Sequence, residues 1–109
     1  MKSTRYYSDR QEKQVARGIG GRQVANSGAT SFHKGDLKTK NFLIECKTAV
    51  QHKNSFAIKL EWLLKNKEEA FAMNKSHNAL AFNFGPDEEN YYIIDEKLFK
   101  ILVEYIEGN

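Results

Sequence analysis

The feature that most constrains the fold is the stretch 41–48, where charged residues alternate along an apolar, β-prone run. The segment Asn41-Phe42-Leu43-Ile44 leads into Glu45-Cys46-Lys47-Thr48. Successive side chains of a strand point to opposite faces, so Glu45 and Lys47 share one face and Cys46 takes the other. Charges on an otherwise apolar strand are costly unless they are paired or coordinated. The stretch therefore predicts a buried strand that carries a site.

A second carboxylate is expected beside this strand. Asp36 precedes Glu45 by nine positions, within a predicted strand over residues 32–38. A polar turn near residues 39–40 predicts that the two strands form a hairpin. One edge of the sheet then carries two carboxylates and the ammonium of Lys47, which suits holding a divalent cation and activating water against a phosphodiester. The alternative is a salt-bridge cluster within the hairpin.

The remaining pattern predicts an α/β fold. Ser8 is expected to cap a first helix, with Gln11 as its capping-box partner, and Gly18, Gly20 and Gly21 are expected to end that helix. Helices are predicted over residues 8–17, 58–73 (from Ile58 or Lys59) and 96–106, and strands over 22–25, 32–38, 41–48, 79–84 and 91–94. The order α-β-β-β-α-β-β-α predicts a mixed central β-sheet flanked by helices, in a single domain over residues 1–109.

Composition excludes several classes of protein. The chain has one cysteine, so it forms no internal disulfide, and it has no CxxC pair of the kind that builds structural zinc sites. It contains neither an apolar run near eighteen residues nor a segment patterned as a signal peptide, so no membrane association is expected. A cytoplasmic location is predicted, in the host cell if a phage encodes the protein.

Charge is distributed unevenly along the chain. Residues 1–53 carry eleven Lys and Arg against four acids, a net charge of +7, whereas residues 54–109 carry six Lys against ten acids, a net charge of −4. The basic half is the half that contains the charged strand. Such a surface attracts phosphates, so the distribution favours a nucleic-acid partner over a merely solvated charged surface.

At this point the chain resembles a known family. A helix with Glu12, then Gly35-Asp36, then Asp-x8-Glu-x-Lys across a hairpin is similar to the PD-(D/E)XK nuclease superfamily, and most of all to its archaeal-type and phage-type Holliday junction resolvases. The likeness covers roughly residues 8–95, and Gly35 stands where proline is frequent. The narrower likeness is carried by Asn26-Ser27-Gly28-Ala29, Lys34-Gly35-Asp36, residues 42–48, Ser55-Phe56-Ala57-Ile58-Lys59 and Glu61-Trp62-Leu63.

The resemblance implies a restriction-endonuclease-like core and a Mg²⁺-dependent endodeoxyribonuclease, with Mn²⁺ as a possible substitute. Asp36 and Glu45 would hold the metal, the main-chain carbonyl of Cys46 would be a further ligand, and Glu12 would complete the shell. Lys47 would orient or deprotonate the attacking water, or neutralise developing charge. For Glu12 the alternative is an exposed helical residue paired with a nearby cation. The implied substrate is a four-way DNA junction, cut by a homodimer.

Further residues are candidates for DNA contact. Ser27 lies in a turn that approaches DNA by resemblance, and Lys59 opens the second long helix, where the helix dipole does not favour a cation. Trp62 is expected in the core, and six aromatics exceed the needs of one small core: Phe82, Phe84, Tyr91, Tyr92, Phe99 and Tyr105. The candidate phosphate contacts are Arg5, Arg10, Lys13, Arg17, Arg22, Lys34 and Lys38.

Three alternatives remain open at the level of sequence. The first is a nuclease of the same superfamily with another DNA target, such as a flap, an end or a restriction-type site. The second is a non-catalytic DNA-binding protein on a nuclease fold, although such a protein would be free to lose Asp36, Glu45 and Lys47. The third, an RNA-directed nuclease, has no aromatic RNA-binding motif in its favour.

Overall fold

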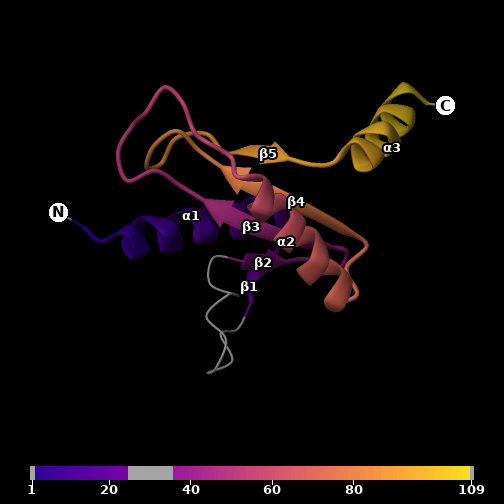
Figure 1. Ribbon diagram of the computed structural model, residues 1–109, viewed down its shortest axis with the longest axis horizontal. Coiled ribbons are helices and arrows are strands. Elements are labelled where there is room, and N and C mark those ends of the chain that lie inside the picture. Colours follow the sequence, from indigo (N-terminus) through magenta and orange to yellow (C-terminus); the bar gives the residue numbers. More distant parts are fainter. Residues whose placement is uncertain (1, 25–35, 109) are drawn as a thin grey trace.

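The computed structural model describes residues 2–24 and 36–108, which form an α/β fold around a five-stranded mixed sheet (Figure 1). Along the described chain the elements are α1 (Thr4–Ile19), β1 (Arg22–Gln23), β2 (Asp36–Lys38), β3 (Phe42–Lys47), α2 (Leu60–Ala72), β4 (His77–Phe82), β5 (Tyr91–Ile93) and α3 (Glu96–Glu107). The α/β class and the predicted order of the elements are confirmed.

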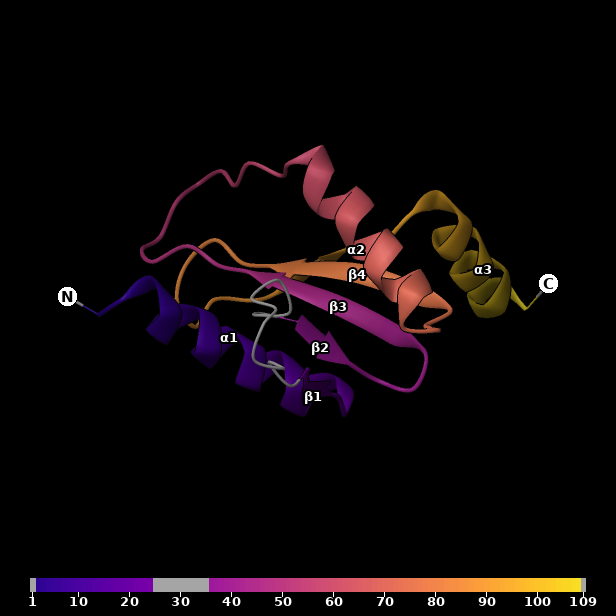
Figure 2. The same cartoon turned by 60° about the horizontal axis from the view of Figure 1, so that its bottom comes forward.

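The strands lie in the order β1-β2-β3-β4-β5. β2 and β3 are antiparallel, as the predicted hairpin requires, and β3 runs parallel to β4 through the crossover helix α2. Viewed along the sheet, α1 lies on one side and α2 on the other (Figure 2). The mixed sheet is therefore sandwiched between two helices that are far apart in the sequence.

The alternation along β3 divides the core between the two helices. Ile44 and Cys46 pack with Val15 of α1 and with small alanines of β4, which leave room for the helix. On the opposite side, Leu43 is completely buried beneath α2. Cys46 therefore points away from Glu45 and Lys47, as predicted.

Helix α1 begins earlier than predicted. Ser3, not Ser8, is its N-cap: the Ser3 side chain accepts a hydrogen bond from the backbone N–H of Tyr6 (3.2 Å). No residue between Ser3 and Ser8 breaks a helix, so the first available cap is the one used. The helix also passes through Gly18 and ends where Gly20 adopts a left-handed conformation with φ 71°.

Three other predicted boundaries also differ. β4 spans residues 77–82, not 79–84, because its parallel register places His77 opposite Phe42, and Phe84 leaves the sheet to accept a hydrogen bond from Lys53 N–H (2.8 Å). Helix α2 starts at Leu60, since Lys59 is extended at the N-cap. β1 is two residues long, and residues 32–35 of the predicted second strand lie outside the described part of the chain.

Helix α3 lies beyond the end of the sheet (Figure 1). Asp95 caps it by accepting a hydrogen bond from Leu98 N–H (2.9 Å), and Leu98 is its one buried residue. Its other large apolar side chains are exposed: Phe99, Ile101, Leu102, Val103, Tyr105 and Ile106. None of the helices in residues 2–24 and 36–108 has the length and apolarity needed to cross a membrane.

Candidate active site

The two carboxylates that the sequence singles out meet across the β2–β3 hairpin. Asp36 lies directly opposite Glu45 in the antiparallel register, on the α2 side of the sheet. Side chains paired in this way have Cβ atoms about 5 Å apart. Asp36 is 2% exposed, and burial raises its pKa to about 8, with the neighbouring carboxylate of Glu45 as the next cause. Asp36 and Glu45 are therefore cross-strand neighbours, and a metal held between them stays a prediction.

Lys47 stands beside this pair on the same face of β3. Its ammonium lies 3.2 Å from Glu45 Oε2 and 4.3 Å from the centre of the Trp62 ring. Lys59 Nζ approaches the same ring at 5.8 Å. The ammonium of Lys47 lies over the face of the Trp62 ring, a cation–π contact. Trp62 is half-buried, so the prediction of a core tryptophan is only partly correct.

A simple salt-bridge cluster accounts for only part of this arrangement. Lys47 and Glu45 do form an ion pair. Burial outweighs the opposing effect of Lys65 and raises the pKa of Asp36. Negative charge is therefore unfavourable at Asp36, and metal binding there stays a prediction.

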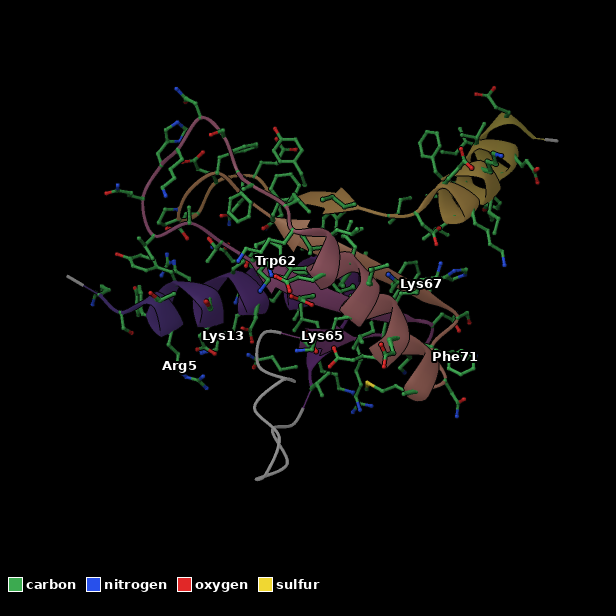
Figure 3. All side chains as sticks on the ribbon, viewed as in Figure 1. Arg5, Lys13, Trp62, Lys65, Lys67 and Phe71 are labelled. Atoms are coloured by element: carbon green, nitrogen blue, oxygen red, sulfur yellow. The ribbon has the colours of Figure 1, made fainter. Side chains whose placement is uncertain are left out.

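Helix α2 adds two charged residues, Lys65 and Glu69, to the surroundings of Asp36. Glu69 helps to raise the pKa of Asp36, and Lys65 opposes the rise, so both lie within electrostatic range of it. Figure 3 shows Lys65 extending from α2 toward the β2 edge, whereas Lys67 points the other way. The missed signal is helical spacing: residues 62, 65 and 69 form one stripe on α2.

Glu12 reaches the site region from the other side of the sheet. It is 8% exposed, accepts a hydrogen bond from Gln23 Nε2 (2.8 Å), and burial raises its pKa. The alternative of an exposed, cation-paired Glu12 is therefore wrong. Gln23 pairs with Leu37, whose side chain lies in the core on the α1 side of the sheet. Glu12 contacts Gln23, so it lies on the opposite face of the sheet from Asp36. Glu12 still contributes to the raised pKa of Asp36.

A buried polar network, also missed from sequence, fixes the end of β3. The side-chain amide of Gln11 donates to the carbonyl of Lys47 (2.7 Å) and to Asn90 Oδ1 (3.1 Å). Thr48 Oγ1 donates to Asn83 Oδ1 (2.6 Å), and Asn83 in turn donates to Asn90 (3.4 Å). Helix α1 thereby sets the position of the backbone that carries Lys47.

Cys46 contributes no nucleophile. Burial and the surrounding carboxylates raise the pKa of its thiol far above the ordinary value, so the thiolate does not form at neutral pH. Its side chain belongs to the α1-side core. Only the main-chain carbonyl of Cys46 remains available as the metal ligand predicted from sequence.

The candidate DNA-contact residues fall into different settings. Arg10 forms a 2.6 Å ion pair with Asp87, and Lys13 pairs with Asp9 at 3.1 Å. Arg22 is exposed on β1, and Lys59 is exposed at the start of α2. Ser27 and Lys34 lie outside the described residues. DNA contact by any of these residues stays a prediction.

Within residues 2–24 and 36–108 there is no group of three or more His, Cys, Asp or Glu side chains arranged to hold a metal ion. The site consists instead of a carboxylate pair with lysines around it. Protein-family models, curated proteins and solved structures give no match to this chain. The functional conclusion therefore rests on the geometry of the site.

Proposed function

We propose that this protein is a Mg²⁺-dependent endodeoxyribonuclease of the PD-(D/E)XK type, with a restriction-endonuclease-like core, that cleaves branched DNA as a homodimer. The observation that carries the proposal is the buried Asp36 opposite Glu45 with the ammonium of Lys47 beside them. The preferred substrate is a four-way junction, so the protein would act as a Holliday junction resolvase.

The carboxylate pair suits Mg²⁺ better than a closed metal cage would. Mg²⁺ keeps several of its waters and is bound through one or two carboxylates together with substrate phosphate. Asp36 and Glu45 provide these two carboxylates, with the carbonyl of Cys46 as a further proposed ligand. A pKa of about 8 means that Asp36 holds a proton near neutral pH in the absence of metal, and a cation would displace that proton. Bound there, Mg²⁺ would stabilise the negative charge of the reacting phosphate.

Lys47 is the residue placed to act on the attacking water and the phosphate. Glu45 and Trp62 hold its ammonium from two sides, so little freedom is lost when it donates to a phosphate oxygen. Its donation would neutralise charge that develops in the transition state or orient the attacking water. Gln11 keeps the Lys47 backbone in register with the carboxylates.

The cations around the site support DNA as the substrate. Arg5 and Lys13 project from α1, and Lys65 projects from α2, toward the side of the molecule that bears the β2 edge (Figure 3). With Lys47 and Lys59, they line the approach to the carboxylates, where Lys13 and Lys47 are each paired with an acid, Asp9 and Glu45. A polyanion arriving along this edge is attracted to the site.

Helix α3 supports the homodimer. Its residues Phe99 and Ile106 are 58% and 76% exposed, and a contiguous apolar face of this kind marks an interaction surface. Beside it lies a cavity of about 580 Å³ with apolar residues of α1, the sheet and α3 in its wall, among them Ile19, Phe42 and Tyr92. A second copy presents the same two surfaces, so a two-fold interface covers both at once. Three of the six aromatic residues that exceed the needs of a small core, Phe82, Phe84 and Tyr91, instead pack against one another within the chain.

The proposal is tested by cleavage of a synthetic four-way junction under Mg²⁺, with flap and linear duplex substrates in parallel. Asp36→Asn and Glu45→Gln are expected to reduce junction cleavage to background. The matched control is Glu104→Gln, which removes the same charge from exposed α3 and is expected to cleave like the wild type. Cleavage that survives both site substitutions would refute the assigned chemistry.

The same assay separates the alternatives. Equal cutting of linear duplex and junction indicates a nuclease of another DNA target, and preference for flaps or ends names that target. Junction binding without cleavage indicates a non-catalytic DNA-binding protein. Faster cutting of junctions than of the other substrates supports the resolvase.

A further inference from the structure

A positively charged pocket lies on the surface of the protein, separate from the carboxylate pair. It has a volume of about 410 Å³ and sits where the end of α1 meets the β2–β3 turn. Its walls are formed by Gly20, Arg22, Lys38, Thr39, Lys40 and Lys75. Four of the six lining residues are cations, and no acid stands among the described residues that line it.

Structural roles account for only part of this charge. Lys75 donates to the main-chain carbonyls of Thr39 (2.8 Å) and Lys40 (3.3 Å), which ties the segment after α2 to the hairpin turn. The C-terminal ends of α1 and α2 lie nearby, and each helix end carries roughly half a negative charge. Four cations against about one negative charge leave a positive surplus of about three. That surplus is suited to an anionic ligand.

The pocket and the candidate active site lie along the same strand, β2. Lys38 stands two residues beyond Asp36 on β2, so it lies on the same side of the sheet, and Arg22 pairs with Lys38 on β1. At about 3.3 Å per residue along β2, the pocket begins about 7 Å from Asp36 at Lys38 and continues into the turn at Lys40. Successive phosphates of one DNA strand are separated by the rise of about 3.4 Å and by rotation around the helix axis, so they lie about 7 Å apart.

We infer that this pocket binds a backbone phosphate of the cleaved strand, one or two nucleotides from the phosphate held at Asp36 and Glu45. The inference rests on the proposed nuclease function. It gives the pocket a positioning role: a second phosphate fixed there sets the direction in which the strand crosses the active site. Base identity is not read, so the contribution is the same for every sequence.

The test compares Lys38→Gln/Lys40→Gln with the control Lys97→Gln/Lys100→Gln, which removes the same charge from exposed α3. Junction binding is measured in EDTA over a range of salt concentrations, and phosphate ethylation interference maps the contacts. One lost phosphate contact lowers the slope of log affinity against log salt by about 0.9. The pocket variant is expected to show this loss and to lose interference at one phosphate one or two nucleotides from the cut. Arg22→Gln, an exposed single substitution, provides the same readout if the double variant unfolds.

The outcomes distinguish failure of the pocket assignment from failure of the nuclease function. If pocket and control variants change the slope equally, or the interference pattern is unchanged, the pocket assignment is overturned while the nuclease function stands. If the wild type binds the junction but does not cut it, the nuclease function falls, and a slope loss confined to the pocket variants still supports phosphate binding. If the wild type binds no DNA, both are overturned.

Discussion

At the scale of single residues, Asp36 is the most informative. An aspartate with a pKa of about 8 holds a proton in the folded protein that the unfolded chain releases near its ordinary pKa of about 4. Between these two values the folded state binds more protons than the unfolded state, so stability falls as pH rises and levels off above the folded pKa. An ionised Asp36 therefore lowers the free energy of unfolding, and a residue that lowers stability in this way is typical of a functional position.

This sign gives a prediction for Asp36→Asn, measured by urea unfolding in EDTA. At pH 4 the variant and the wild type are expected to have similar free energies of unfolding, because both side chains are neutral in the folded state. At pH 9 the variant is expected to be more stable by on the order of a few kcal/mol, since it removes a buried charge. Glu104→Gln, which removes the same charge from exposed α3, serves as the control. A gap between Asp36→Asn and wild type that does not change with pH would contradict the raised pKa.

At the scale of elements, periodicity predicted the helices and strands in the right order, because alternation in β3 and helical spacing in α2 are strong local signals. It also placed Asp36 on the strand that pairs with the strand of Glu45, because a short polar turn predicts a hairpin, and the exact register became visible only in the structure. The partners of Glu12 and the approach of Glu69 were not predictable. Periodicity identifies the apolar side of a helix, but it does not say which strand edge the polar side overhangs.

Gln11 provides a prediction at this scale, because it connects α1 to the end of β3. Replacing it with leucine keeps the volume but leaves the buried carbonyl of Lys47 without its 2.7 Å donor. The expected loss is about 1–3 kcal/mol of unfolding free energy, measured by chemical denaturation. Gln14→Leu is the matched control: it lies on the same helix and bonds to exposed Asp87, so a change within about 0.5 kcal/mol is expected. Equal losses for both variants would contradict the structural role given to Gln11.

At the scale of the whole molecule, two surfaces are turned outward. One is the cationic edge that runs past the carboxylates to the pocket at the end of α1, and the other is the apolar face of α3. They use different residues, although each surface draws on both halves of the sequence. The proposed DNA binding and the proposed self-association would therefore not compete for the same residues.

The α3 surface is tested with Phe99→Glu/Ile106→Glu. Both side chains are mostly exposed, so the folded monomer is expected to keep its stability while the dimer dissociates. Sedimentation velocity measures the oligomeric state, and thermal unfolding monitors the fold. Lys100→Glu, on the polar side of the same helix, is expected to remain dimeric. A wild type that sediments as a monomer at micromolar concentration would refute the dimer.

In the proposed homodimer, two chains would pair through α3, whose buried residue in each chain is Leu98, and pairing would depend on how many chains are present. A four-way junction is resolved only when two strands are cut, and one chain carries one site. At low abundance most chains would be single, and double cutting would rise with the square of their concentration. Resolution would then behave as a threshold response, almost absent in a cell that contains few copies and rapid once the protein accumulates.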